Sequence, residues 1–184
     1  MKPILAKAIR GAVVALALFV VAAGAPSARA EPKDVYAAIG ERLSVIRAVA
    51  AWKVARGAPV EDLDREAVVL EKATESAGKQ GLDAASTRAF FQAQITAAKA
   101  IQTCWITRWN GVPPNEPTPD LVTEIRPELI RLGAEIVAKI RLSLEAGQTL
   151  GPSPDFDALV DLECLPGPDR AAIAAALSQV SLAD

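Results

Sequence analysis

Long segments with helical spacing of apolar residues most constrain what this chain can fold into. Strand-like alternation of apolar and polar residues is absent, and glycine- and proline-containing stretches such as NGVPPNEPTP separate the segments. Pro127 is expected to bend the fourth segment or to mark its true start. The pattern predicts an all-α protein, a helical bundle of about six helices. The predicted helices span residues 33–56, 61–79, 83–109, 119–146, 155–163 and 168–181.

The first 30 residues have the pattern of a secretory signal peptide. Three basic residues precede an uncharged apolar run, GAVVALALFVVAAGA, and Ala28 and Ala30 form a small-x-small motif before a cleavage site. An uncleaved membrane anchor is the alternative, but the run is shorter than the ~20 residues that a span needs. We therefore expect cleavage after Ala30. The mature domain, residues 31–184, would then be periplasmic or secreted and free of the membrane.

Charge and composition exclude several classes of function. Cleavage removes four basic and no acidic residues, which leaves 16 basic and 22 acidic side chains and a formal charge of −6. Such a protein is poorly suited to bind nucleic acid or an anionic membrane. The chain has no histidine, which excludes Ser-His-Asp and Cys-His nucleophile pairs and the usual histidine-ligated metal and haem sites. We expect neither a metal nor a cofactor.

The two cysteines, Cys104 and Cys164, lie 60 residues apart, which is not a metal-ligand spacing. In an exported protein this pair favours a disulfide. Two separate buried thiols are the alternative.

Polar side chains fall on the apolar faces of two predicted helices. Arg42 and Lys53 are eleven residues apart, so they differ by only about 20° around the helix axis and share an apolar face. Gln94 and Gln102 lie within the apolar face of residues 90–102, with Gln92, Thr96 and Lys99 opposite. Two buried cations need an anionic partner, unless their long side chains extend past the core so that the charged ends reach water.

The second and fourth segments repeat the pattern, with polar residues inside or beside an apolar stripe. The interior would then combine four cations with one carboxylate, which predicts a site for a small dianion with two carboxylates. Without a nucleophile or a histidine, such a site could act only by positioning and electrostatics. The residues expected there are Arg42, Lys53, Arg65, Glu66, Gln94, Gln102 and Arg126.

These residues and their order resemble the all-helical, type II chorismate mutases. Arg42 and Lys53 are followed by the motifs PVEDLDRE, FFQAQITAAKAIQ and IRPEL, and the signal peptide is similar to that of the secreted gamma subclass. The resemblance covers about residues 41–132, and the last 50 residues carry no motif of it. It implies an isomerase that rearranges chorismate to prephenate, a step toward aromatic amino acids, without a cofactor. The active site would lie inside one chain, whether or not a homodimer forms.

The resemblance also implies residue roles. Arg42 and Arg126 would anchor the substrate carboxylates, with Arg65 supporting that anion site. Lys53 and Gln102 would donate hydrogen bonds to the ether oxygen whose bond to carbon breaks.

Other residues would bind the ring hydroxyl of the substrate or have a structural role. Glu66 would accept the hydroxyl hydrogen, and Asp62 would contribute mainly its backbone. Gln94 matches a structural position and is expected to bond to backbone or to a neighbouring side chain. Ala98 and Val69 replace polar residues of relatives, which removes secondary contacts to the substrate.

Two other functions fit the same cluster. A non-catalytic periplasmic binding protein would hold a small dicarboxylate without converting it, and a helical interaction module would have no affinity for one. The pairing of Lys53 with Gln102 favours turnover, because a neutral ether oxygen needs two donors only if charge develops on it.

We predict that the mature protein begins at Glu31. N-terminal sequencing of the exported protein checks this directly. A membrane-bound product that retains Met1 would contradict it.

Overall fold

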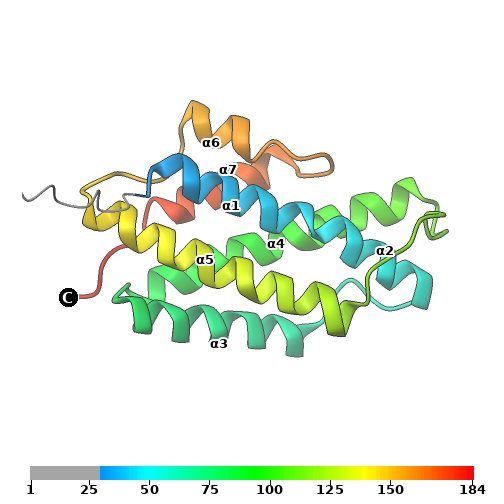
Figure 1. Cartoon of the computed structure of the whole chain (residues 1–184). Coiled ribbons are helices and arrows are strands. Elements are labelled where there is room, and N and C mark those ends of the chain that lie inside the picture. The colour runs from blue at the N-terminus through cyan, green and yellow to red at the C-terminus, as the bar shows by residue number, and fades with distance from the viewer. Residues whose placement is uncertain (1–29) are drawn as a thin grey trace, which may run out of the picture.

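The computed structural model of the chain describes residues 30–184, which form a bundle of seven α-helices and one π-helical turn (Figure 1). In this range the only β-type pairing is a single bridge between Leu82 and Leu182, and the all-α prediction is confirmed. The predicted signal peptide, apart from Ala30, lies outside the described residues. The elements are α1 (Pro32–Ser44), α2 (Ile46–Arg56), α3 (Leu63–Gln80), α4 (Ala84–Arg108), η1 (Leu121–Ile125), α5 (Arg126–Glu145), α6 (Pro154–Leu159) and α7 (Gly167–Leu177).

The first predicted helix is interrupted at Val45, so the expectation of one continuous helix was wrong. The Ser44 hydroxyl donates to the Glu41 carbonyl oxygen at 2.7 Å, and the Val45 amide reaches the same oxygen only at 3.4 Å. A side chain that competes for a helix carbonyl weakens the backbone bond there and often bends the helix. This interruption gives one helix more than the sequence pattern predicts.

The fourth predicted helix begins with the π-helical turn η1. Asp120 Oδ1 accepts hydrogen bonds from two backbone amides of this turn, each at 2.9 Å. Pro127, which has no amide hydrogen, lies at the second position of α5. The prediction that Pro127 marks the true start of the regular α-helix is confirmed.

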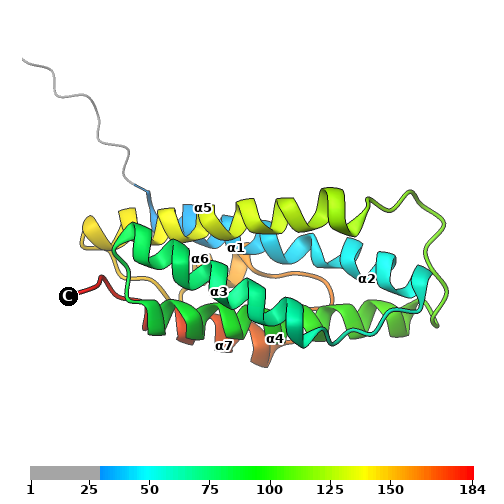
Figure 2. The same ribbon diagram turned by 90° about the horizontal axis from the view of Figure 1, so that it is seen from below.

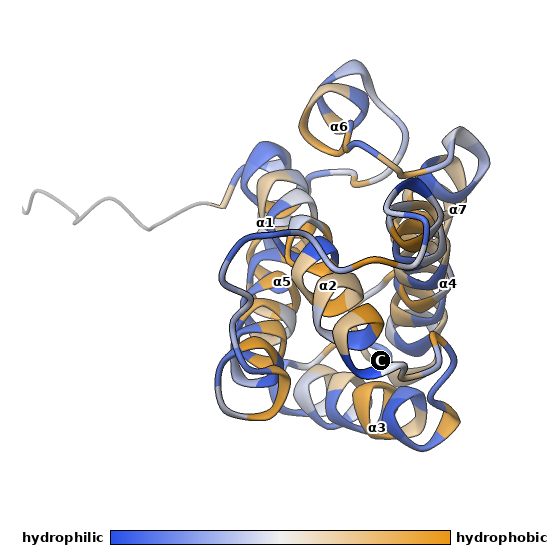
Figure 3. Cartoon of the chain, turned by 90° about the vertical axis from the view of Figure 1, so that its right-hand side faces the viewer, coloured by the Kyte–Doolittle hydropathy of each residue, from blue (hydrophilic) through white to orange (hydrophobic). Residues whose placement is uncertain are grey.

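The helices enclose an interior on four sides. Helix α4 packs against α2, α3 and α7, and α5 packs against α1 and α3, as the views from below and along the bundle show (Figures 2 and 3). Phe90, Ile101, Ile136 and Ile140 are fully buried between these helices. Among the described residues, no helix has the length and apolar character needed to span a membrane.

The C-terminal segment completes the core although it carries no family motif. Phe156 of α6 packs edge-on against Tyr36 of α1, with ring centroids 5.2 Å apart. Gly40 permits this approach, because a Cβ there would lie 2.4 Å from the Leu159 carbonyl oxygen. The tail runs back to the α3–α4 turn, where the Asp83 amide donates to the Ser181 carbonyl oxygen at 2.9 Å. Helix α6 therefore packs against α1, and α7 packs against α4, on one side of the bundle.

The predicted disulfide is confirmed. Cys104 of α4 is bonded to Cys164, which precedes α7, with the two Cα atoms 5.7 Å apart. The bond ties the C-terminal segment to α4 only two residues from Gln102.

Replacing both cysteines, Cys104→Ser and Cys164→Ser, should lower the free energy of unfolding by about 4 kcal/mol, the chain-entropy value for a loop of this length. Urea unfolding of the oxidised wild type and the double variant measures the difference. Wild type unfolded in the presence of a reductant is the control and should match the variant. Coincident curves for oxidised wild type and variant would contradict the expectation.

Candidate active site

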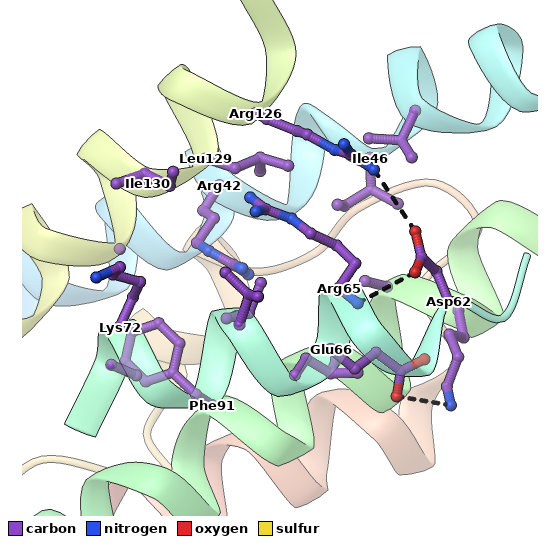
Figure 4. Close-up of a pocket in the computed structure, with 18 of the residues that line it drawn as sticks. Arg42, Ile46, Asp62, Arg65, Glu66, Lys72, Phe91, Arg126, Leu129 and Ile130 are labelled. Carbon is purple, nitrogen blue, oxygen red and sulfur yellow. Dashed lines mark hydrogen bonds and ion pairs between the residues drawn. The ribbon is translucent and has the colours of Figure 1, made fainter. Parts of the chain in front are cut away.

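One cavity of about 390 Å³ lies within the bundle, lined mainly by residues of α1, α2, α3, α4 and α5 (Figure 4). The structure brings together on its wall every residue to which the resemblance gives a role at the substrate. These residues are Arg42, Lys53, Asp62, Arg65, Glu66, Gln102 and Arg126.

Arg42 is the most buried cation of the cavity, with 5% of its surface exposed. Its Nη1 donates to Gln94 Oε1 at 3.2 Å, and its guanidinium lies 5.7 Å from the centre of the Phe91 ring. Burial, and secondarily the charge of Arg65, lower the pKa of Arg42 to about 10, so the group stays charged at neutral pH. The expectation that Gln94 bonds to a neighbouring side chain is confirmed.

A hydrogen bond to a backbone carbonyl group orients the Lys53 side chain. Its Nζ donates to the Val60 carbonyl oxygen at 2.6 Å, and the residue is 7% exposed. Burial is the main cause of its lowered pKa, and the nearby carboxylate of Asp62 opposes that shift. Arg42 and Lys53 are both buried, which argues against the alternative in which their charged ends reach water.

Asp62 joins the start of α3 to the start of α5. Its Oδ1 accepts from the Arg65 amide at 3.1 Å and so caps α3, while its Oδ2 lies 3.5 Å from Arg126 Nη2 (Figure 4). Burial, and then the charge of Arg126, lower the pKa of Arg65. The two arginines therefore stand close enough to repel each other, and one carboxylate stabilises the pair.

Glu66 and Gln102 each present a buried oxygen without a hydrogen-bond partner among the described residues. Glu66 Oε2 accepts from Lys99 Nζ at 3.2 Å, whereas Oε1 is unpaired. Gln102 Nε2 donates to the Ala98 carbonyl oxygen at 3.0 Å, and its Oε1 is unpaired. Buried acceptors normally have a donor, so both side chains fit a site that a ligand completes.

The chain is similar in sequence to known proteins. Residues 33–103 match the family described as chorismate mutase type II. The chain is 35% identical over 111 residues to the monofunctional chorismate mutase of Enterobacter agglomerans, a match that spans 60% of this chain and 61% of that protein. It is 30% identical over 146 residues to the secreted chorismate mutase of Yersinia pestis, which covers 78% of each chain. The chain belongs to the type II chorismate mutase family.

Solved structures of the family share the fold. The crystal structure of the secreted chorismate mutase from Yersinia pestis superposes with a TM-score of 0.75 at 29% identity, over 81% of this chain and 97% of that one. The chorismate mutase from Burkholderia thailandensis gives a TM-score of 0.62 at 28% identity, over 80% and 96% of the two chains.

Two apolar side chains line the cavity at positions where the resemblance implies polar ones in relatives. These are Ala98 and Val69. They contribute only apolar surface there.

Sequence reasoning misplaced Lys99. The helical pattern put it opposite the apolar face of α4, but it lines the cavity and pairs with Glu66. Its position three residues before Gln102 was the available signal, because residues three apart are neighbours on a helix.

We expect Gln94→Leu to lower the free energy of unfolding by about 1.5–3 kcal/mol, because it removes the acceptor of a buried guanidinium. Gln92→Leu, two residues away on the exposed face of the same helix, is the matched control and should change stability by less than about 0.5 kcal/mol. Urea unfolding measures both. Equal stabilities of the two variants would show that the contact between Gln94 and Arg42 contributes little.

Proposed function

We propose that residues 31–184, released by cleavage after Ala30, form a periplasmic or secreted chorismate mutase, an isomerase that converts chorismate to prephenate. The observation that carries this proposal is the convergence of Arg42, Lys53, Arg65 and Arg126 on one cavity in a member of this family. Chorismate carries two carboxylates, and such a cavity is suited to a dianion. All the lining residues come from one chain, so the proposal needs no second copy.

Two arginines serve as carboxylate anchors in this proposal, with Arg65 beside them. Arg42 is oriented by Gln94 and by the Phe91 ring, and Arg126 is oriented by Asp62. A guanidinium held by neighbours loses little freedom when it binds a carboxylate. The two anchors fix the substrate in the compact conformation that reacts.

The reaction needs no nucleophile and no proton transfer. Within one bound molecule the ether C–O bond breaks as a C–C bond forms, and negative charge develops on the ether oxygen. Lys53 and Gln102 stabilise that charge as hydrogen-bond donors. The Gln102 amide nitrogen has two hydrogens, of which Ala98 engages one, so the second remains available. Glu66 Oε1 accepts the hydrogen of the ring hydroxyl.

Conversion of chorismate by the purified mature chain tests the function. Chorismate absorbance should fall as an equal amount of prephenate appears. Binding without conversion would favour the periplasmic dicarboxylate-binding protein, and no binding would favour the helical interaction module.

Gln102→Glu should make activity acid-dependent. A glutamate can donate to the ether oxygen only when protonated, and its unperturbed pKa is about 4.3. The variant should therefore be active below the pKa of the new carboxyl group and lose activity as pH rises through it, whereas wild type stays active through neutral pH. Parallel profiles of kcat/KM against pH measure this.

Gln92→Glu, the same substitution on the exposed face of α4, is the control and should follow the wild-type profile. If the Gln102→Glu profile superimposes on that of wild type as well, Gln102 does not donate to the reacting oxygen.

A further inference from the structure

An ion pair joins α4 to α3 at the edge of the cavity. Lys99 Nζ lies 3.2 Å from Glu66 Oε2 and 3.5 Å from Glu61 Oε1. The Glu66 side chain is 17% exposed and lines the cavity, whereas that of Glu61 is 66% exposed and does not. Glu66 is therefore the inner partner of Lys99 and Glu61 the outer one.

The contact with Lys99 makes the two oxygens of Glu66 different. Oε2 is engaged by the ammonium group, and Oε1 is buried without a partner in the described part of the chain. A carboxylate free to rotate could present either oxygen to a ligand. This one is held at Oε2, so only Oε1 remains for a hydroxyl hydrogen.

Lys99 also supplies charge that the site needs. A carboxylate beside a bound dianion repels it unless a cation lies close to the carboxylate. The hydrogen bond from Lys99 to Glu66 is the largest cause of the raised pKa of Lys99, so the ammonium form persists through neutral pH. The pair therefore presents an acceptor oxygen with little net negative charge.

We propose that Lys99 is a positioning residue of the active site, which fixes Glu66 through Oε2 and offsets its charge so that Oε1 accepts the hydroxyl hydrogen of a dianionic substrate. The inference rests on the proposed function and deepens it. Lys99 acts through Glu66 and does not itself touch the substrate.

A purely structural ion pair between two helices is the competing explanation. Such a pair would contribute to the stability of the bundle whatever the ligand. The two explanations differ in one property. If Lys99 is a positioning residue, its effect on turnover depends on the charge of Glu66.

A double-mutant cycle of Lys99→Met and Glu66→Gln tests this dependence, with chorismate turnover by the purified mature chain as the measurement. Lys99→Met alone should lower kcat/KM about tenfold, the equivalent of one charge-assisted hydrogen bond, with most of the loss in KM. Lys99→Arg keeps the cation and should restore kcat/KM to within about threefold of wild type. In the Glu66→Gln background, where an acceptor remains but its charge is gone, Lys99→Met should change kcat/KM less than about twofold.

Lys139→Met is the matched control. Lys139 is 29% exposed against 31% for Lys99, and it pairs with Glu135 at 2.6 Å within α5, away from the cavity lining. Its replacement should leave kcat/KM unchanged. Equal losses from Lys99→Met with and without the charge of Glu66, or a loss below twofold in wild type, would overturn the inference. A wild-type protein that does not convert chorismate would overturn the proposed function and this inference with it.

Discussion

The burial of two cations with only neutral partners is the interaction on which the rest of the site depends. Arg42 donates to a glutamine oxygen and Lys53 to a backbone carbonyl oxygen, and neither forms an ion pair within residues 30–184. A carboxylate at either position would have neutralised the charge and filled the place of a ligand. Neutral acceptors orient both cations and leave their positive charge available to an anion. Burial is the main cause of the lowered pKa of both groups; the charge of Arg65 adds to it at Arg42, and the carboxylate of Asp62 opposes it at Lys53.

An interior with uncompensated charge weakens the fold, so stability has to come from elsewhere in the bundle. Fully buried side chains such as Phe90 and Ile140 provide apolar contacts away from the cavity. The C-terminal segment adds Phe156 under α1 and the disulfide at Cys104 on α4. None of these four residues lines the cavity. The segment that carries no family motif thus supports the helices from which the polar side chains project.

Sequence spacing predicted the helices and the convergence of polar groups, because both follow from local periodicity. The eleven-residue separation of Arg42 and Lys53 fixes their common direction whatever surrounds them. Periodicity could not decide whether these cations reach water, since that depends on which helices pack over them. It misplaced Lys99 for the same reason, because α3 brings Glu66 to the edge of the α4 face. The interruption at Val45 coincides with a hydrogen bond from one hydroxyl, which the spacing of apolar residues does not reveal.

Several buried polar atoms in the described structure have no hydrogen-bond partner, and they relate the stability that the site costs to its proposed chemistry. Four of these eight atoms lie at or directly behind the cavity, on Arg42, Gln94, Glu66 and Gln102. Each unpaired group destabilises the empty protein by about 1–3 kcal/mol. A ligand hydroxyl would recover that free energy at Glu66 Oε1, whereas an ether oxygen, which only accepts, cannot pair Gln102 Oε1. A reaction without a nucleophile can be accelerated only by groups already in position before charge develops. Acceleration further requires that these groups bind the transition state more tightly than the substrate. In the proposed function Lys53 and Gln102 meet this condition at the ether oxygen, where the substrate is nearly neutral and the transition state is not. In that proposal these two donors, and not the carboxylate anchors, separate a catalyst from a protein that only holds a dicarboxylate.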